Sequence, residues 1–370
     1  CYDNTGVVID SNGATAGSSL LAHDGLTNGP SLAEAASGYA IGFINLSDEL
    51  TLNVRGTNGS LLKPSSTFQI TDYYAYMDRE GLTALSDGSY VATWSFSKDD
   101  IYPPWDNPGA TVDDSMGIKL LRFTPAQDGS LRVGTPIEVA PEVPYVHAGK
   151  PAITALTGGG YVVSWNTSSQ DYAGEHNLYA QIYSASNAPV GARMTIAEGN
   201  QSNPNLAPSI SALNNGGFVT TWLEGSNSSW YSNVLARVYA ADGTAVTDEI
   251  TVQNSEGYLT PPCVTGLADG GFSISWAYTT VGDSNDDKLF TQRFTADGTP
   301  VTYDVLIGTN SDDVFNLIGK TRAVAAEGRA GDDIYQVDSP AFIIERADAG
   351  IDTVEAAVSY TLPAYVENLI

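Results

Sequence analysis

The strongest constraint on the fold of this chain is an internal repeat. A block of alternating apolar and polar residues that ends in Trp occurs four times. The copies are LTALSDGSYVATW (82–94), ITALTGGGYVVSW (153–165), ISALNNGGFVTTW (210–222) and VTGLADGGFSISW (264–276), with a degenerate copy, SLAEAASGYAIGF, at 31–43. A second apolar block, such as VLARVYAADGTAV (234–246), follows each copy. Self-similarity at a fixed period indicates small structural units that bury their apolar faces against one another.

Each repeat has the pattern of four short strands. Apolar and polar side chains alternate, and Asp-Gly or Gly-Gly pairs separate the runs, which is typical of antiparallel strands joined by tight hairpins. About 5.5 such repeats over residues 1–307 predict a five- or six-bladed β-propeller, with a sandwich or an open β-solenoid as the alternative. The residues expected to pack between neighbouring blades are Trp94, Trp165, Trp222 and Trp276.

The loop that follows each Trp strand varies most between repeats. Because these loops occupy equivalent positions in each blade, we expect them on the same face of the propeller. Their aromatic residues are interleaved with Asp, Asn and Ser, a composition that suits sugar binding, and they are Tyr102, Trp105, Tyr172, Trp230 and Tyr231. The alternative is that these rings only hold long loops against the rim of the propeller.

The pattern changes after residue 307, and residues 308–370 form a second predicted domain. Three segments share one outline: GTNSDDVF (308–315), GRAGDDIY (328–335) and ADAGIDTV (347–354). They resemble the nonapeptide calcium repeats of RTX proteins, exported bacterial proteins of the hemolysin and serralysin type, whose consensus is Gly-Gly-x-Gly-x-Asp-x-apolar-x. The resemblance implies a short parallel β-roll, and the upstream Trp-ending repeats are also similar to repeats of large RTX-type proteins.

In such a roll, turns on the same side lie roughly 18 residues apart. Asp313, Asp333 and Asp352 recur at steps of 20 and 19 residues, so we expect them on one side. Ca²⁺ takes six to eight oxygen ligands. The expected ligands are the side chains of Asp313 and Asp333 with the carbonyl groups of Gly308, Asn310, Gly328 and Ala330, and a second site would use Asp333 and Asp352. The alternative is that these segments are ordinary Asp-Gly turns in a solvated tail.

Composition excludes several protein classes. The chain has 16 Lys and Arg against 43 Asp and Glu, a formal net charge of −27, so it lacks the basic clusters that bind nucleic acid. No apolar run is long enough to insert into and cross a membrane. Enzyme motifs such as HExxH, GxSxG and the P-loop are absent, and His23, His147 and His176 lie in separate predicted loops. A disulfide between Cys1 and Cys263 and two free thiols stay alternatives.

These features together predict an exported, calcium-stabilised protein of the cell surface or extracellular matrix that binds glycans or scaffolds by assembling with copies of itself. Secretion through a type I channel is what the RTX resemblance implies. The chain begins halfway through a repeat, so we expect either a fragment of a longer protein or a polymer subunit completed by its neighbours. The alternative function is a secreted polysaccharide hydrolase or lyase, which a buried carboxylate pair with raised pKa in the central channel or loop face would favour.

Overall fold

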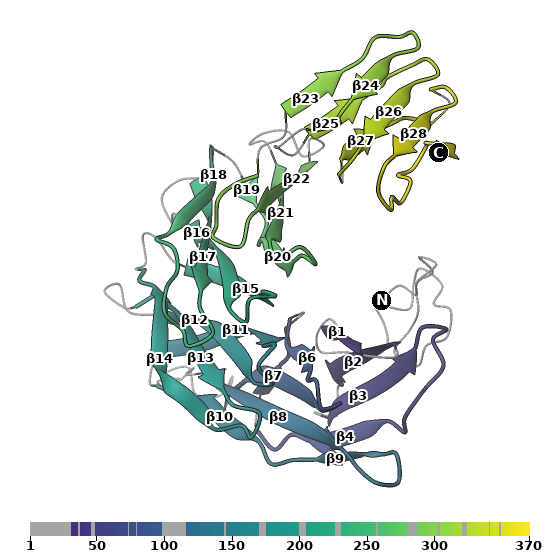
Figure 1. The fold of residues 1–370 in the computed structure, drawn as a ribbon. Helices are drawn as coiled ribbons and strands as arrows, with labels where there is room; N and C mark the ends of the chain where they lie inside the picture. The colour runs from purple at the N-terminus through teal and green to yellow at the C-terminus, as the bar shows by residue number, and fades with distance from the viewer. Residues whose placement is uncertain are drawn as a thin grey trace. The chain divides into compact units, whose positions relative to one another are not determined.

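The computed structural model describes most of the chain, and its described residues form strands, turns and loops without a helix (Figure 1). The described residues are 31–35, 38–45, 49–72, 74–78, 80–97, 116–143, 146–169, 175–199, 205–225, 231–256, 258–279, 287–301, 304–319, 324–339, 341–347 and 349–370. The prediction of an all-β fold is confirmed. In the described part of the chain there is accordingly no helix with the length and apolarity needed to cross a membrane. The chain divides into two compact units, Cys1–Thr299 and Pro300–Ile370.

The described residues of the first unit form five antiparallel sheets in chain order. Sheet 1 comprises β1 (Ser31–Ala35), β2 (Gly38–Ile44), β3 (Glu49–Gly56) and β4 (Ser66–Gln69). Sheet 2 comprises β5 (Tyr74–Tyr76), β6 (Leu82–Ala84), β7 (Tyr90–Ser97), β8 (Gly117–Pro125), β9 (Leu131–Val133) and β10 (Ile137–Ala140). Sheet 3 comprises β11 (Val146–Ala155), β12 (Tyr161–Ser169), β13 (Leu178–Tyr183) and β14 (Pro189–Ala197), and sheet 4 comprises β15 (Asn205–Ala212), β16 (Phe218–Gly225), β17 (Tyr231–Tyr239) and β18 (Ile250–Glu256). Sheet 5 comprises β19 (Tyr258–Leu259), β20 (Cys263–Gly266), β21 (Phe272–Thr279) and β22 (Asp287–Phe294).

The hairpin that precedes each Trp strand shows why the repeat folds as a meander. Gly159 and Gly216 occupy the same place in two of these turns with φ of 88° and 92°, a backbone conformation that a residue with a Cβ avoids. The side-chain oxygen of Asn215 accepts the N–H of Gly217 at 3.0 Å and closes the second of these turns. The turn therefore fixes the register in which the Trp side chain faces the interior.

The four Trp residues pack between consecutive sheets, as the sequence predicts. Their exposed fractions are 0% for Trp94, 1% for Trp165, 0% for Trp222 and 5% for Trp276. Trp222 of sheet 4, for example, lies in one buried cluster with Val162 of sheet 3. Four-stranded meanders that bury large residues against the next sheet are the blades of a β-propeller.

The second unit has a different topology. Its strands are β23 (Asp304–Ile307), β24 (Val314–Asn316), β25 (Val324–Glu327), β26 (Ile334–Val337), β27 (Phe342–Ile344), β28 (Thr353–Ala356) and β29 (Asn368–Leu369). They form two parallel sheets, one of β23, β25 and β27 and the other of β24, β26, β28 and β29. The chain thus winds between the two sheets, and β23, which the sequence pattern joined to the last upstream repeat, pairs in parallel with β25.

The interior of the second unit is a column of stacked side chains. Phe315 of β24 pairs with Tyr335 of β26, and Tyr335 pairs with Val354 of β28. The Phe315 and Tyr335 rings stack with centroids 4.9 Å apart. Successive residues of this column are 20 and 19 positions apart in the sequence, the same spacing as the turn aspartates. The turns that precede β24, β26 and β28 therefore also stack on one another.

Candidate functional site

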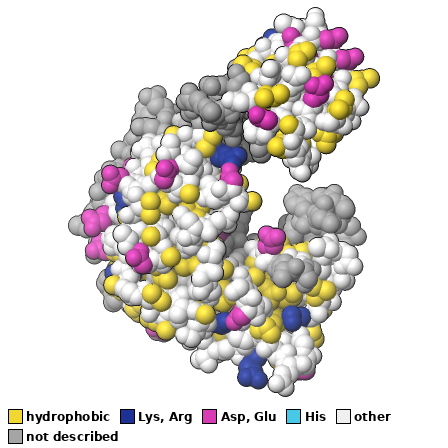
Figure 2. Space-filling model, in the orientation of Figure 1, with side chains coloured by type: hydrophobic (Ala, Val, Ile, Leu, Met, Phe, Trp, Pro, Cys, Tyr) yellow, Lys and Arg dark blue, Asp and Glu magenta, His cyan; other side chains and the backbone are white. Residues whose placement is uncertain are grey.

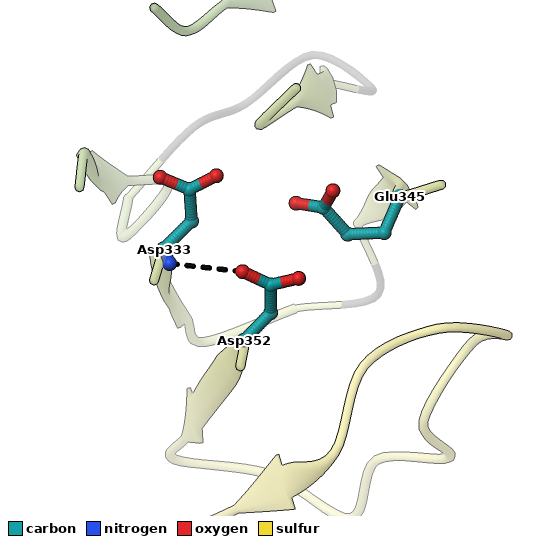
Figure 3. A group of neighbouring side chains, drawn as sticks. All are labelled: Asp333, Glu345 and Asp352. Atoms are coloured by element: carbon teal, nitrogen blue, oxygen red, sulfur yellow. Dashed lines mark hydrogen bonds between the residues drawn. The ribbon is translucent and has the colours of Figure 1, made fainter. Parts of the chain in front are cut away.

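A cluster of buried carboxylates lies inside the second unit. Asp333 and Asp352 directly precede β26 and β28, and Glu345 directly follows β27 of the opposite sheet. Asp333 and Asp352 are each 1% exposed and Glu345 is 8% exposed. One oxygen from each residue lies within 4.8 Å of the other two, and Figure 3 shows the three carboxylates pointing toward one another. This group could hold a metal ion.

Backbone hydrogen bonds between successive turns hold two of these side chains in place. The carboxylate of Asp352 accepts the N–H of Asp333 at 2.9 Å, the dashed line in Figure 3, and the carboxylate of Asp333 accepts the N–H of Asp313 at 2.8 Å. The other oxygen of each Asp, and one oxygen of Glu345, is buried without a hydrogen-bond partner in the described part of the chain. Buried polar atoms that lack a partner are destabilising, so the arrangement favours a cation bound among them.

The electrostatics of the cluster also favour a bound cation. Burial is the main cause that raises the pKa of Asp333, Glu345 and Asp352, and repulsion from neighbouring carboxylates raises each of them further. The hydroxyl of Tyr335 donates a hydrogen bond to Glu345, and burial raises the pKa of this tyrosine as well. A bound cation would reverse the shift of the carboxyl groups because it favours their ionised forms.

Gly328 leaves the space in which these oxygens meet. A Cβ at this position would collide with a carboxylate oxygen of Glu345, one of Asp333 and the hydroxyl of Tyr335. The second turn segment therefore requires glycine at its first position for steric reasons, and the three oxygen atoms converge beside its Cα. Hard oxygen ligands that converge in a buried space are what Ca²⁺ selects.

The structure brings together some of the metal ligands expected from the sequence. Asp333 and Asp352 lie in the cluster, whereas the carboxylate of Asp313 stays in its own turn and accepts the N–H of Thr309 at 2.6 Å. A Cβ on Gly308 would meet that same carboxylate at 2.9 Å. Two further expected ligands, Asn310 and Ala330, line a hollow on these turns. Sequence reasoning missed Glu345 because the residue lies outside the turn motif and reaches the cluster from the other sheet.

A second candidate site lies in the first unit, where the linker between β5 and β6 carries Glu80. The carbonyl oxygen of Glu80 accepts the N–H of Ile153 in sheet 3 at 2.9 Å, and its carboxylate accepts the N–H of Ile210 in sheet 4 at 3.2 Å. Ser209, next to Ile210, in turn accepts the N–H of Val264 in sheet 5 at 3.0 Å through its hydroxyl oxygen. Glu80 therefore connects the linker of sheet 2 to β11 of sheet 3 and β15 of sheet 4, and β15 is connected in turn to β20 of sheet 5.

The surroundings of Glu80 move the pKa of its carboxyl group to near neutral pH. Burial, the largest effect, raises its pKa to about 7 from the usual 4.5, although hydrogen bonds from Ser209 and Ile210 lower it, and the charge of Asp78 raises it slightly. Asp78 and Glu80 are both partly exposed residues, and one carboxylate oxygen of Asp78 is buried. A partly exposed carboxyl group that titrates near pH 7 is suited to proton transfer.

A sequence signal for Glu80 exists but is subtle. When the repeats are aligned on LTAL (82–85), ITAL (153–156), ISAL (210–213) and VTGL (264–267), Glu80 stands where the other three copies have Pro151, Pro208 and Pro262. Register shifts occur at this place in β11 and β15. An acidic residue in place of a repeated Pro is therefore the feature that could have identified the site.

The sugar-binding aromatic residues proposed from the sequence fall largely outside the described structure. Tyr102, Trp105, Tyr172 and Trp230 lie outside the described residues, and Tyr231 is described only as the first backbone position of β17. Cys1 and His23 also lie outside them, so the pairing of Cys263 stays open. His147 and His176 belong to no metal-ligand group among the described residues.

Comparison with known proteins gives only remote structural likenesses. No family model and no curated protein matches the chain. An α-L-arabinofuranosidase of Fusarium graminearum in complex with arabinobiose is 10% identical, covers 72% of this chain and 83% of its own, and has a TM-score of 0.45. A native arabinanase of Bacillus subtilis is 14% identical, with coverages of 74% and 97% and a TM-score of 0.42. A Bacillus licheniformis endo-arabinanase is 14% identical, with coverages of 75% and 97% and a TM-score of 0.39.

These findings correct the function predicted first from the sequence. The three structures quoted above are named as an arabinofuranosidase and two arabinanases, and none as a surface or matrix protein, so the main prediction of a surface or matrix protein with a binding, adhesive or structural role is contradicted. At identities and TM-scores this low, the activities named are those of the other proteins, and any activity of this chain has to be argued from its own residues. The RTX resemblance and the export route that it implies stay predictions.

Proposed function

We propose that the first unit cleaves polysaccharide, as a hydrolase or a lyase, with Glu80 as the group that transfers the proton. The observation that supports this most is that Glu80, partly exposed and hydrogen-bonded to sheets 3 and 4, has its pKa raised to about 7. A carboxyl group of this pKa can protonate a leaving glycosidic oxygen or, when ionised, remove a proton from a sugar ring. Asp78, in the same linker, acts on Glu80 through its charge and is our candidate for the second carboxylate that glycoside hydrolysis requires.

The test is an assay of the whole chain on a panel of neutral and acidic polysaccharides. New reducing ends would report hydrolysis, and ultraviolet absorbance of an unsaturated product would report elimination. We expect Glu80→Gln to lower the rate by about 100-fold or more, because the amide cannot transfer the proton. Glu198→Gln, at an exposed position after β14, is the matched control and should keep full activity. Absence of product across the panel, or equal rates for the Glu80→Gln variant and the unchanged chain, would reject the proposal.

We propose further that the carboxylates of Asp333, Glu345 and Asp352 bind Ca²⁺ and thereby stabilise the second unit. Support comes from their burial, their convergence within 4.8 Å and the oxygen atoms left without a hydrogen-bond partner in the described chain. Bound Ca²⁺ would supply charge neutralisation to a unit that is otherwise self-repelling. Calorimetric titration of the whole chain should show calcium binding that Asp352→Asn weakens by about tenfold or more. Equal calcium affinity of Asp352→Asn and the unchanged chain would mean that calcium does not bind at these carboxylates.

A further inference from the structure

The second unit carries a hollow of about 590 Å³ whose charge differs from that of its surroundings. It crosses three stacked turns and is lined by Asn310, Glu327, Arg329, Ala330, Arg346 and two further alanines. The volume lies in the range typical of sites for small molecules, and one or two sugar rings would fill it. Apart from the charged residues, the lining side chains are short. The two arginines therefore determine the kind of ligand that the hollow can bind.

The only Lys or Arg residues among the described positions of the second unit are Arg329 and Arg346, and both line this hollow. The remainder of the unit is predominantly acidic, and several Asp and Glu side chains are visible on its face in Figure 2. Two guanidinium groups and the Glu327 carboxylate give the described lining residues one net positive charge. In a chain with a formal charge of −27, such a concentration of cations attracts anions locally.

The two arginines differ in how they are held. Arg346 is paired with Glu327 at 2.8 Å, and this pair uses one of its guanidinium nitrogens while its side chain stays 73% exposed. The side chain of Arg329 forms no hydrogen bond or ion pair with any described residue. Its backbone has φ of 81°, a left-handed conformation that is uncommon for a residue with a side chain and that recurs at functional positions.

We propose that this hollow binds the carboxylate of an acidic sugar, a uronate unit of a polysaccharide. Planar guanidinium groups bind carboxylates through paired hydrogen bonds, and a single net positive charge matches a singly charged carboxylate better than a doubly charged phosphate. The amide of Asn310 can hydrogen-bond to sugar hydroxyl groups. This inference deepens the proposed function, on which it rests, by naming the acidic class of polysaccharide as the one this chain holds.

The test compares a galacturonate trisaccharide with the neutral galactose trisaccharide of the same linkage, by calorimetric titration of the whole chain. Calcium is kept at one concentration throughout, because uronates themselves bind this ion. The informative variant is Arg329→Gly, which removes the guanidinium and at the same time relieves the left-handed backbone, so loss of folding is not expected. Arg293→Gln, on an exposed ion pair with Asp269 in the first unit, is the control.

We expect the acidic trisaccharide to bind and the neutral one not to bind, with Arg329→Gly weakening binding by about tenfold or more and Arg293→Gln leaving it unchanged. Equal binding of the neutral sugar, unchanged binding by Arg329→Gly, or displacement by inorganic phosphate at lower concentration than the sugar would each overturn the inference. Glu80→Gln should keep this binding. Binding of the acidic trisaccharide with no product across the polysaccharide panel would refute the proposed enzyme activity alone. Product on the panel with unchanged trisaccharide binding by Arg329→Gly would refute the uronate site alone.

Discussion

At the scale of single residues, Glu80 makes the stability of the first unit depend on pH. Its pKa is about 7 in the folded chain against 4.5 for the free group, so the folded state holds the proton more tightly. The stabilisation is therefore complete below about pH 4.5 and is lost as the pH rises through 7. Urea unfolding followed by Trp fluorescence measures this unit alone, because all six Trp residues lie before residue 300. We expect Glu80→Gln to abolish this part of the pH dependence, and an unchanged slope would contradict the assignment.

Gly328 gives a second prediction at this scale. In Gly328→Ala the new methyl group must displace the carboxylates of Glu345 and Asp333, so we expect calcium affinity to fall by about tenfold or more. The control is Gly158→Ala, whose Cβ meets nothing within 4 Å and whose backbone is not left-handed. Calcium titration of both variants checks the prediction. Loss of affinity in both, or in neither, would show that the space beside Gly328 is not what the cation needs.

At the scale of elements, the repeated strands depend on the residue that packs between sheets. Trp222 of β16 is fully buried between sheets 3 and 4, and its replacement by Ala should lower the free energy of unfolding by about 3–5 kcal/mol. Val246→Ala, at a position that is 52% exposed, should change it by less than about 0.5 kcal/mol. Urea unfolding measured by circular dichroism compares the two. A similar decrease in the free energy of unfolding for both variants would mean that Trp222 does not pack between the sheets.

The elements also show what a sequence can reveal about this fold. The alternation around Trp165 and the turn at Gly159 are local patterns, so the strands, the hairpins and the burial of the Trp residues between sheets could be predicted from them. The 20- and 19-residue steps likewise predicted which turn aspartates would stack. Glu345 escaped prediction because its role depends on contact with strands of the other sheet. For Glu80 the repeat alignment marks an acidic residue in place of Pro, but it does not show which strands the residue contacts. No local period encodes such a contact.

At the scale of the whole molecule, the two units should respond differently to calcium. The proposed ligands all lie in the second unit, whereas the buried cores of the first unit are apolar clusters between sheets. An ion that binds only the folded second unit stabilises that unit by about 2.7 kcal/mol at a hundred times its dissociation constant. The units should therefore unfold in separate steps, with the step of the second unit alone sensitive to calcium.

Calorimetry combined with Trp fluorescence can separate the two units, because all six Trp residues lie in the first unit and identify its transition. We expect EGTA to lower the midpoint of the calorimetric transition that Trp fluorescence does not report, while the Trp-reported midpoint stays constant. Asp352→Asn should remove the difference between calcium and EGTA, because one of the three converging carboxylates becomes neutral. If the Trp-reported transition moved together with the other calorimetric transition, the two units would be coupled in stability. If neither moved, calcium would not be stabilising the second unit through the three converging carboxylates, and the proposed site would be wrong.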